Sequence, residues 1–352
     1  MNQSSIAIGS RQPRPKALFR EIPYDKPKAR LLDVDAARGL AIFLVVVGHL
    51  VARETPAGNQ WYAQLKETIY LFHMPLFMVL TGITFALSLP RFQAWSAVAR
   101  FALQRVERLF IPYVAFGLLV LAGKWAASHF LHVDNMPRGS AEDLFRLLLF
   151  PASSVAGFLW FIYVLSIYLL LVPALFQIFG RRPMLLLILG VALQFAAWPQ
   201  LLMLDRVVEY LPFFALGMLL WIYRGAWAQV GPGLRWSSSA LFAALLAMSL
   251  WIELPKWLVG LASVPAVLAW MQNLPAAPQR WLAVLGRASL AIYLMNTIAI
   301  GLTKGVMLKL LPWDGVNFLL YFPLLTVAGI AAPILALQLA TRYSPGCARY
   351  LK

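Results

Sequence analysis

Arg38 and His49 are ionisable residues at the two ends of the first apolar stretch of the sequence, RGLAIFLVVVGHL. Eleven residues apart, they would share one face of an α-helix, about 16 Å from each other along its axis. Histidine is the side chain best suited to take a proton from a hydroxyl group near neutral pH. The spacing fits equally well a buried histidine bonded to a neighbouring helix, with Arg38 as an interface anchor. Asp35 is placed either to pair with Arg38 or to cap the helix.

A second histidine, His73, lies early in the next apolar stretch, YLFHMPLFMVLTG. Two consecutive helices with a short connection pack as an antiparallel pair, which would bring His73 to a depth similar to that of His49. The two rings are then candidates for one shared pocket, and Pro75 and Gly82 would loosen the helix beside it. The alternative is a histidine at the interface that contacts lipid headgroups.

Two arginines three residues apart, Arg105 and Arg108, occur in QRVERLFIPY at the start of the third apolar stretch. Residues at this spacing share a helix face. Two guanidinium groups side by side suit a polyphosphate ligand such as coenzyme A. The alternative is a pair of ordinary positive anchors at the cytoplasmic boundary.

Other polar and aromatic residues give weaker signals. Candidates for an aromatic wall, a helix contact or a charged partner are Trp160, Tyr163, Glu209, Tyr210, Tyr293 and Asn296. His129, His132 and Asp134 lack a clear further ligand, so we expect no metal. The sequence contains no G-x-S-x-G elbow, no P-loop and no H-E-x-x-H signature.

The amino-acid composition indicates that these residues lie in a protein whose surface is largely covered by lipid. The chain has 352 residues, of which 61% are hydrophobic and 12% are charged. A soluble domain carries roughly twice that charged fraction, so lipid must cover much of the surface. The net charge of +16 sits at the ends of apolar runs, which argues against nucleic-acid binding. The single cysteine, Cys347, excludes a disulfide framework.

Ten apolar segments are long enough, or nearly so, to span a bilayer. They are 36–52, 68–89, 105–127, 157–178, 184–199, 206–223, 237–253, 256–271, 282–304 and 317–341. With a cytoplasmic N-terminus, most of the 30 Lys and Arg residues fall on the inner side, as the positive-inside rule requires. We predict an all-α, polytopic integral membrane bundle of about ten helices with both termini in the cytoplasm. The longest connection, 128–156, faces outward and includes an amphipathic stretch at 141–150.

Several of these stretches together resemble the type-3 acyltransferase family of bacterial membrane O-acyltransferases, and most of all its fucose 4-O-acetylase-like branch. DAARGLAIFLVVVGH is similar to the first-helix signature, in which ten residues separate the Arg of a DxxR from a His. FHMPLFMVLTG, RVERLFIPY, LWFIYVLSIYLL and RASLAIYLMN resemble further family segments, in the family's order. The similarity covers about residues 32–339.

The resemblance implies an acyl-CoA donor on the cytoplasmic side, here acetyl-CoA, and an acceptor hydroxyl on O-antigen, exopolysaccharide, peptidoglycan or a lipid-linked sugar. It implies His49 as general base, Arg38 in the same site and His73 as a further site residue. Arg105 and Arg108 would hold the donor. Many relatives have a His after the late Tyr-Leu, where this chain has Met295 and Asn296, so that position receives no proton-transfer role.

The resemblance also divides the chain. We expect a basic cytoplasmic N-terminal tail at 1–32, a membrane acyltransferase domain at 33–341 and a short cytoplasmic C-terminal tail at 342–352. The tail lacks the apolar core of a signal peptide, and its charge predicts attraction to anionic lipid. We expect a multi-pass protein of the bacterial inner membrane, with the acceptor recognised by the bundle and its loops.

Other functions stay open from the sequence. One is transfer of succinyl or another acyl group to a glycan, which would need a cation near the donor, and Lys124 is a candidate. Another is a glycan transporter or flippase, because intramembrane Arg and His also serve substrate paths. A purely structural scaffold would explain the helices but not the order of the polar residues.

Overall fold

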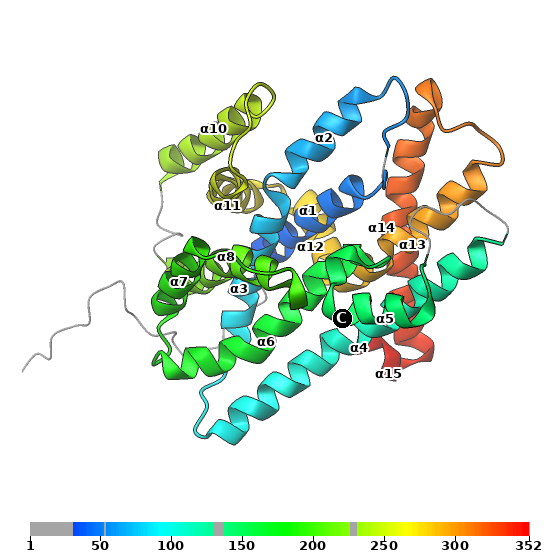
Figure 1. The fold of residues 1–352 in the computed structure, drawn as a ribbon. Helices are drawn as coiled ribbons and strands as arrows, with labels where there is room; N and C mark the ends of the chain where they lie inside the picture. The colour runs from blue at the N-terminus through cyan, green and yellow to red at the C-terminus, as the bar shows by residue number, and fades with distance from the viewer. Residues whose placement is uncertain (1–30, 53, 130–136, 226–230, 352) are drawn as a thin grey trace, which may run out of the picture.

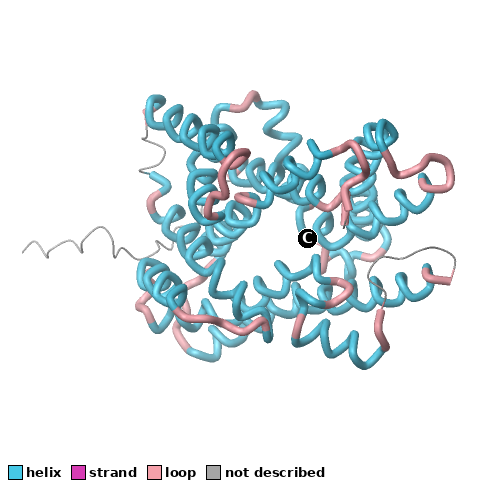
Figure 2. The backbone as a smooth tube through the Cα atoms, turned by 45° about the horizontal axis from the view of Figure 1, so that its top comes forward, coloured by secondary structure: helices cyan, strands magenta, loops and turns pink. Residues whose placement is uncertain are grey.

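The chain folds into a bundle of helices, and the residues described by the computed structural model include no strand (Figures 1 and 2). These residues are 31–52, 54–129, 137–225 and 231–351. Most of the predicted N-terminal tail, together with His132 and Asp134, lies outside them. The prediction of an all-α fold is confirmed for the described residues.

The long helices follow the apolar stretches of the sequence. Their bounds are α1 Leu32–Gly48, α2 Gln60–Tyr70, α3 His73–Ser88, α4 Trp95–Ala127, α5 Ser140–Leu149, α6 Trp160–Ile178, α7 Pro183–Ala192, α8 Leu204–Ile222, α10 Pro232–Met248, α11 Lys256–Asn273, α12 Ala276–Arg287, α13 Ser289–Met307, α14 Phe318–Tyr343 and α15 Pro345–Ala348. Three of them, α7, α10 and α15, begin with a proline, whose fixed φ angle and missing N–H suit the first helical position.

Five helical segments of the described chain are long and apolar enough to cross a membrane. They are Gln60–Ser88, Trp95–Ala127, Gly157–Ile178, Ser289–Met307 and Gly315–Tyr343. This finding supports a membrane protein. The count of ten spans and the cytoplasmic location of both termini stay predictions.

Several predicted elements differ from the structure. The predicted third helix, 105–127, begins ten residues earlier, at Trp95, so Arg105 and Arg108 lie within α4 and not at its start. The first helix ends at Gly48 instead of residue 52, so His49 follows its last turn. The predicted second helix, 68–89, is two helices, α2 and α3, separated at Leu71 and Phe72. The predicted ninth helix, 282–304, is divided at Ala288 between α12 and α13. Continuous apolar sequence hides such breaks, because a short interruption of the helix leaves the hydropathy unchanged.

The first helix lies against α12 with almost no space between the two backbones. A β-carbon on Gly39 would stand 1.8 Å from the carbonyl oxygen of Leu282, and one on Gly286 would stand 1.9 Å from that of Asp35. Only glycine permits this approach, and small residues at helix contacts are typical of membrane bundles. The contact fixes the first half of α1, which carries Arg38, beside the junction of α12 and α13.

The predicted amphipathic stretch in the long connection forms α5. The hydroxyl of Tyr113 donates to the carbonyl oxygen of Leu147 at 2.6 Å, and that of Tyr163 donates to Leu148 at 2.7 Å. Leu147 is fully buried, whereas Leu144 and Phe145 are exposed. One face of α5 therefore packs on α4 and α6, and the opposite face is free to contact lipid or solvent.

Candidate active site

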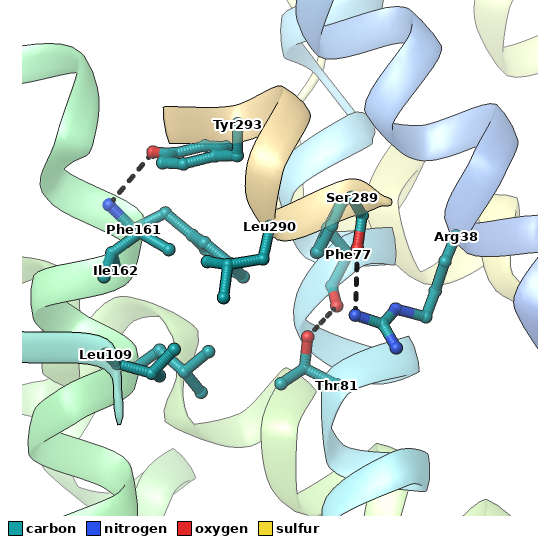
Figure 3. A pocket seen from close by; sticks show the side chains of 10 residues that line it. Arg38, Phe77, Thr81, Leu109, Phe161, Ile162, Ser289, Leu290 and Tyr293 are labelled. Carbon is teal, nitrogen blue, oxygen red and sulfur yellow. Dashed lines mark hydrogen bonds between the residues drawn. The ribbon is translucent and has the colours of Figure 1, made fainter. Parts of the chain in front are cut away.

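Arg38 lies where α1 meets the start of α13. Its Nη2 donates a hydrogen bond to the hydroxyl oxygen of Ser289 at 3.0 Å (Figure 3). Ser289 is buried and is the first residue of α13. The close contact of α1 with α12 brings the junction of α12 and α13 to Arg38. Ser289 can therefore bind Arg38 because the predicted ninth helix is interrupted at Ala288. Ser289 was not a candidate from the sequence.

His49 lies at the opposite end of α1 and is held there by Asn296. The Nδ1 atom of the ring is 2.9 Å from Oδ1 of Asn296. The amide nitrogen of Asn296 donates to the carbonyl oxygens of Ile292 and Tyr293, both at 2.8 Å. This use of the nitrogen turns the oxygen toward the ring. Since a carbonyl oxygen only accepts, the proton must reside on Nδ1 of His49, which leaves a lone pair on Nε2.

Asn296 is itself fully enclosed, with none of its surface exposed. The hydroxyl of Thr297 gives its oxygen a second donor at 3.2 Å. On the sequence, Asn296 was a weak candidate and was expected to be a contact between helices. It is such a contact, and it also sets the tautomer of His49.

The helices α1 and α13 run in the same direction, and hydrogen bonds join them near both ends of α1. On α13, Ser289, Tyr293 and Asn296 are four and three residues apart and therefore share a face. That face meets α1, with Ser289 bonded to Arg38 and Asn296 bonded to His49. The predicted arrangement of Arg38 and His49 on one face of α1 is consistent with these partners.

His73 begins α3 and is buried. Its Nδ1 is 2.7 Å from the carbonyl oxygen of Ile69, so that atom carries a proton. The ring of Tyr70 packs against it, with centroids 5.0 Å apart, and the hydroxyl of Tyr70 donates to Gly48 at 3.0 Å. The two histidines are near enough to interact electrostatically. They are nonetheless held by different partners, and Tyr70 is the contact that joins His73 to the His49 end of α1.

A pocket of about 130 Å³ lies between α1, α3, α4, α6 and α13 (Figure 3). Its walls are Arg38, Phe77, Thr81, Leu109, Phe161, Ile162, Leu165, Ser289, Leu290 and Tyr293. In Figure 3 the guanidinium group of Arg38 lies at one side of the pocket, Tyr293, Ile162 and Leu109 lie at the other, and Leu290 lies between them. A slender chain with an apolar body and a few hydrogen-bonding groups fits this lining.

Tyr293 joins the pocket to the neighbourhood of His49. Its hydroxyl donates to the carbonyl oxygen of Phe158 at 2.5 Å and accepts from the backbone N–H of Phe161 at 3.2 Å. The ring of Phe158 meets that of His49 edge to face, with centroids 6.4 Å apart. Asn296 follows Tyr293 by three residues on the same face of α13. Tyr293, a wall of the pocket, is therefore linked to His49 through its contact with Phe158.

Arg105 and Arg108 lie on α4, next to this pocket. Leu109, which follows Arg108 in the chain, is one of the pocket walls. Arg108 is exposed, whereas Arg105 is half-buried with its guanidinium 5.0 Å from the centroid of the Phe101 ring. Arg105 lies four residues before Leu109 and therefore shares its face of α4, whereas Arg108 points about 100° around the helix from Leu109.

The remaining candidates serve other contacts. Glu209 pairs with Arg206 at 2.6 Å, and the rings of Trp160 and Tyr210 lie 5.3 Å apart. His129 has its Nδ1 3.0 Å from the carbonyl oxygen of Trp125. Lys124 is not among the walls of the pocket. Within the described ranges, no group of three His, Cys, Asp or Glu side chains could hold a metal ion.

The sequence of the chain is similar to those of known proteins. The chain is 29% identical over 231 residues to nodulation protein NolL of Mesorhizobium japonicum, which covers 65% of this chain and 57% of the relative. It is 32% identical over 196 residues to nodulation protein NolL of Sinorhizobium fredii, covering 54% of this chain and 48% of the relative. The chain thus spans about half the length of these curated relatives. No solved structure matches it.

The match to a family reaches across the whole helical bundle. Residues 31–338 correspond to the acyltransferase domain, from the residue before α1 to the last turns of α14. This range includes the Arg38 and His49 ends of α1, their partners on α13 and the two arginines of α4. The chain belongs to the acyltransferase domain family.

Proposed function

We propose that this chain is a membrane O-acetyltransferase, which moves acetyl from acetyl-CoA to a hydroxyl group of a cell-surface or lipid-linked glycan. His49 is the general base. The observation that carries the proposal is the hydrogen bond from His49 to Asn296, because it leaves Nε2 as a proton acceptor in a fixed orientation. Membership in the acyltransferase family supports the reaction class.

The donor is proposed to bind along the Arg38 pocket. Arg105 and Arg108 carry the charge and the donors that phosphate groups bind, and Arg105 shares a face of α4 with Leu109, a wall of the pocket. The apolar walls suit the pantetheine arm, and Arg38 can donate to an amide oxygen of that arm. The length of α1 from Arg38 to His49, about 16 Å, is the span that an extended arm must cover.

The proton and the acyl group then move in one balanced step. Nε2 of His49 takes the proton from the acceptor hydroxyl while that oxygen forms a bond to the thioester carbonyl carbon. The carbon–sulfur bond breaks, the acetyl group stays on the sugar oxygen, and the thiolate of coenzyme A receives the proton from Nε2. The positions of Tyr70 and His73 support a role in holding the His49 end of α1 against α3.

The other functions have less support. Lys124, the cation that the sequence offered for a succinyl carboxylate, is outside the donor pocket. A glycan transporter does not explain the pocket beside the arginines or the family match. We place the reaction in the bacterial inner membrane, with the donor on the cytoplasmic side.

The test uses membranes that contain the wild-type protein or the His49→Ala variant, supplied with radiolabelled acetyl-CoA. Base-labile acetyl label in the glycan fraction is expected with the wild type and is expected to fall at least about a hundredfold in the variant, because general-base catalysis contributes about 10²–10⁴-fold. His129→Ala is the matched control, since His129 lies outside the acyltransferase site described above and is not among the walls of the pocket. Full activity of His49→Ala would contradict the proposal.

A further inference from the structure

Lys66 is a half-buried lysine on α2 that has no part in the proton transfer to His49. Its ammonium group donates to the carbonyl oxygen of Val51 at 2.7 Å and lies 5.6 Å from the centroid of the Tyr70 ring. Among the described residues, no carboxylate forms an ion pair with it. Charged side chains are rarely buried without such a partner, so the position of this lysine indicates a functional role.

The ammonium group lies at the His49 end of α1. Val51, whose carbonyl oxygen it binds, follows His49 by two residues. The hydroxyl of Tyr70 donates to the carbonyl oxygen of Gly48 at 3.0 Å, and a β-carbon on Gly48 would stand 2.6 Å from Cε1 of the Tyr70 ring. The positive charge of Lys66 acts on the His49 ring. Lys66 and Tyr70 are one turn apart, so they share the face of α2 that brings this cation to the base.

The proposed reaction needs a cation or a hydrogen-bond donor at this end of α1. When the acceptor oxygen attacks the thioester, negative charge develops on the carbonyl oxygen, and catalysts of acyl transfer stabilise that charge. Arg38 is too far away, because it lies about 16 Å from His49 along α1. The backbone of α1 is unfavourable for an anion here, since the C-terminal end of a helix carries partial negative charge. The stabilising group must therefore come from another element.

Other polar side chains near His49 use their donors within the protein. The hydroxyls of Tyr62 and Tyr70 donate to backbone carbonyl oxygens of α1. The amide nitrogen of Asn296 donates twice to the backbone of α13, and Nδ1 of His73 donates to the backbone of α2. An ammonium group has three N–H donors, and Lys66 uses one of them in its hydrogen bond to the backbone. Two donors and a full positive charge remain for a ligand.

We infer that Lys66 binds the carbonyl oxygen of the thioester during acetyl transfer and stabilises the negative charge that develops on it. The inference rests on the proposed function and adds a catalytic residue to it. As the acceptor oxygen bonds to the carbonyl carbon, one electron pair of the C=O double bond moves onto the carbonyl oxygen, to which the ammonium group donates. This oxygen then lies near two positive groups, Lys66 and the protonated His49.

The remaining part of the step returns both side chains to their starting state. The electron pair on the carbonyl oxygen re-forms the C=O double bond as the carbon–sulfur bond breaks. The thiolate of coenzyme A takes the proton from Nε2 of His49, and Lys66 keeps its own protons throughout. The products are the acetylated glycan and coenzyme A, so atoms and charge balance.

The first experiment measures transfer from labelled acetyl-CoA to the de-O-acetylated glycan fraction of the native membranes, with matched amounts of protein. Lys66→Met removes the charge and the donors and keeps a side chain of similar length. Its turnover number is expected to fall about a hundredfold or more, because loss of one oxyanion donor costs about 10²–10³-fold. The half-saturating concentrations of both substrates should change little, since the interaction strengthens in the transition state. Lys66→Arg should be substantially faster than Lys66→Met, because a guanidinium group also donates from a full positive charge.

Lys66 also holds α2 against the end of α1, and two variants separate this contact from catalysis. Tyr62→Phe removes the hydrogen bond from the Tyr62 hydroxyl to the carbonyl oxygen of Val47, which spans 2.8 Å, and leaves Lys66 in place. It is expected to keep most of the wild-type turnover. Lys66→Gln retains an amide donor without the charge, and it serves if Lys66→Met fails to accumulate. Its turnover number is expected to be as low as that of Lys66→Met.

A second experiment tests the contact with the developing charge directly. Methylphosphonyl-CoA carries a tetrahedral, negatively charged phosphorus group in place of the acetyl group and therefore resembles the transition state. Lys66→Met is expected to weaken its binding about tenfold or more, since a hydrogen bond between charged groups is lost. Binding of acetyl-CoA should change little in the same variant. Damage to helix packing alone would weaken the binding of both compounds equally.

The outcomes separate the inference from the proposed function. Wild-type turnover by Lys66→Met or Lys66→Gln would overturn the inference and leave the proposed function intact. Equal losses in Lys66→Met and Tyr62→Phe, or equal effects on the two CoA derivatives, would also overturn it and assign Lys66 to helix packing. Normal turnover with a raised half-saturating glycan concentration would make Lys66 an acceptor ligand instead. No transfer by the wild type, with acetyl-CoA bound, would count against the proposed function itself.

Discussion

Replacing Asn296 with leucine removes the oxygen that holds the His49 ring and keeps a side chain of similar size. The Oδ1–Nδ1 hydrogen bond spans 2.9 Å in a site where Asn296 has no exposed surface. Without it, Nδ1 of His49 loses its acceptor, the ring can rotate, and the proton can move to Nε2. The variant tests whether Asn296 positions the base or only joins two helices.

The magnitude follows from the partner that is lost. A buried donor left without an acceptor costs about 1–3 kcal/mol. One tenfold change in rate corresponds to about 1.36 kcal/mol. If that cost falls on the reactive orientation of His49, the turnover number drops about 5-fold to 160-fold. The half-saturating concentration of acetyl-CoA should stay constant, because Asn296 is not among the walls of the donor pocket.

The assay is acetyl transfer at saturating acetyl-CoA, together with a titration of acetyl-CoA, in membranes with matched amounts of protein. Thr297→Val is the matched control: it removes the weaker donor to the same oxygen, at 3.2 Å, and leaves the bond to His49 in place. It should retain most of its activity. Normal turnover by Asn296→Leu would refute the argument that Asn296 sets the tautomer. A change confined to protein accumulation would assign it to helix packing alone.

Two further predictions concern the helix contact and the donor arginines. Gly39→Ala places a β-carbon 1.8 Å from the α12 backbone and should destabilise the protein by about 1–3 kcal/mol, whereas Gly301→Ala, with nothing within 4 Å, should be neutral or slightly stabilising. Thermal unfolding in detergent compares the two, and equal melting temperatures would disprove the close contact. Arg105→Ala and Arg108→Ala should each raise the half-saturating concentration of acetyl-CoA severalfold and leave the half-saturating concentration of the glycan unchanged. Arg100→Ala is the control, because Arg100 is an exposed arginine on the same helix. If the half-saturating concentration of acetyl-CoA is unchanged in both variants, the two arginines do not bind the donor.

The helices could be predicted because apolar sequence long enough to meet lipid has few alternatives to helix. The histidine and arginine of the first helix stood out for a related reason, since ionisable side chains are costly inside an apolar run. The break at Phe72 gave no such signal. At Ala288, where the chain turns from α12 into α13, the flanking residues Gly286, Arg287 and Ser289 are small or polar, but the mean hydropathy of the segment averages over them.

The partners of the candidate residues were harder to find. Ser289 and Asn296 lie 251 and 247 residues from the side chains that they bind. A single sequence does not indicate which residues of two such distant helices lie side by side. Serine and asparagine are common contacts within membrane bundles, so neither type singles out a site.

Asparagine at position 296 restricts the proton on His49 in a way that a histidine there would not. A histidine could either donate to the Nδ1 atom of His49 or accept from it, because an imidazole ring can present a donor or an acceptor. The amide of Asn296 has one role, since its nitrogen is committed to Ile292 and Tyr293 and its oxygen can only accept. The proton on His49 is therefore confined to Nδ1, and the basic nitrogen is always Nε2. An asparagine here does not weaken the case for His49 as the base, because it makes the direction of proton transfer independent of a second titrating group.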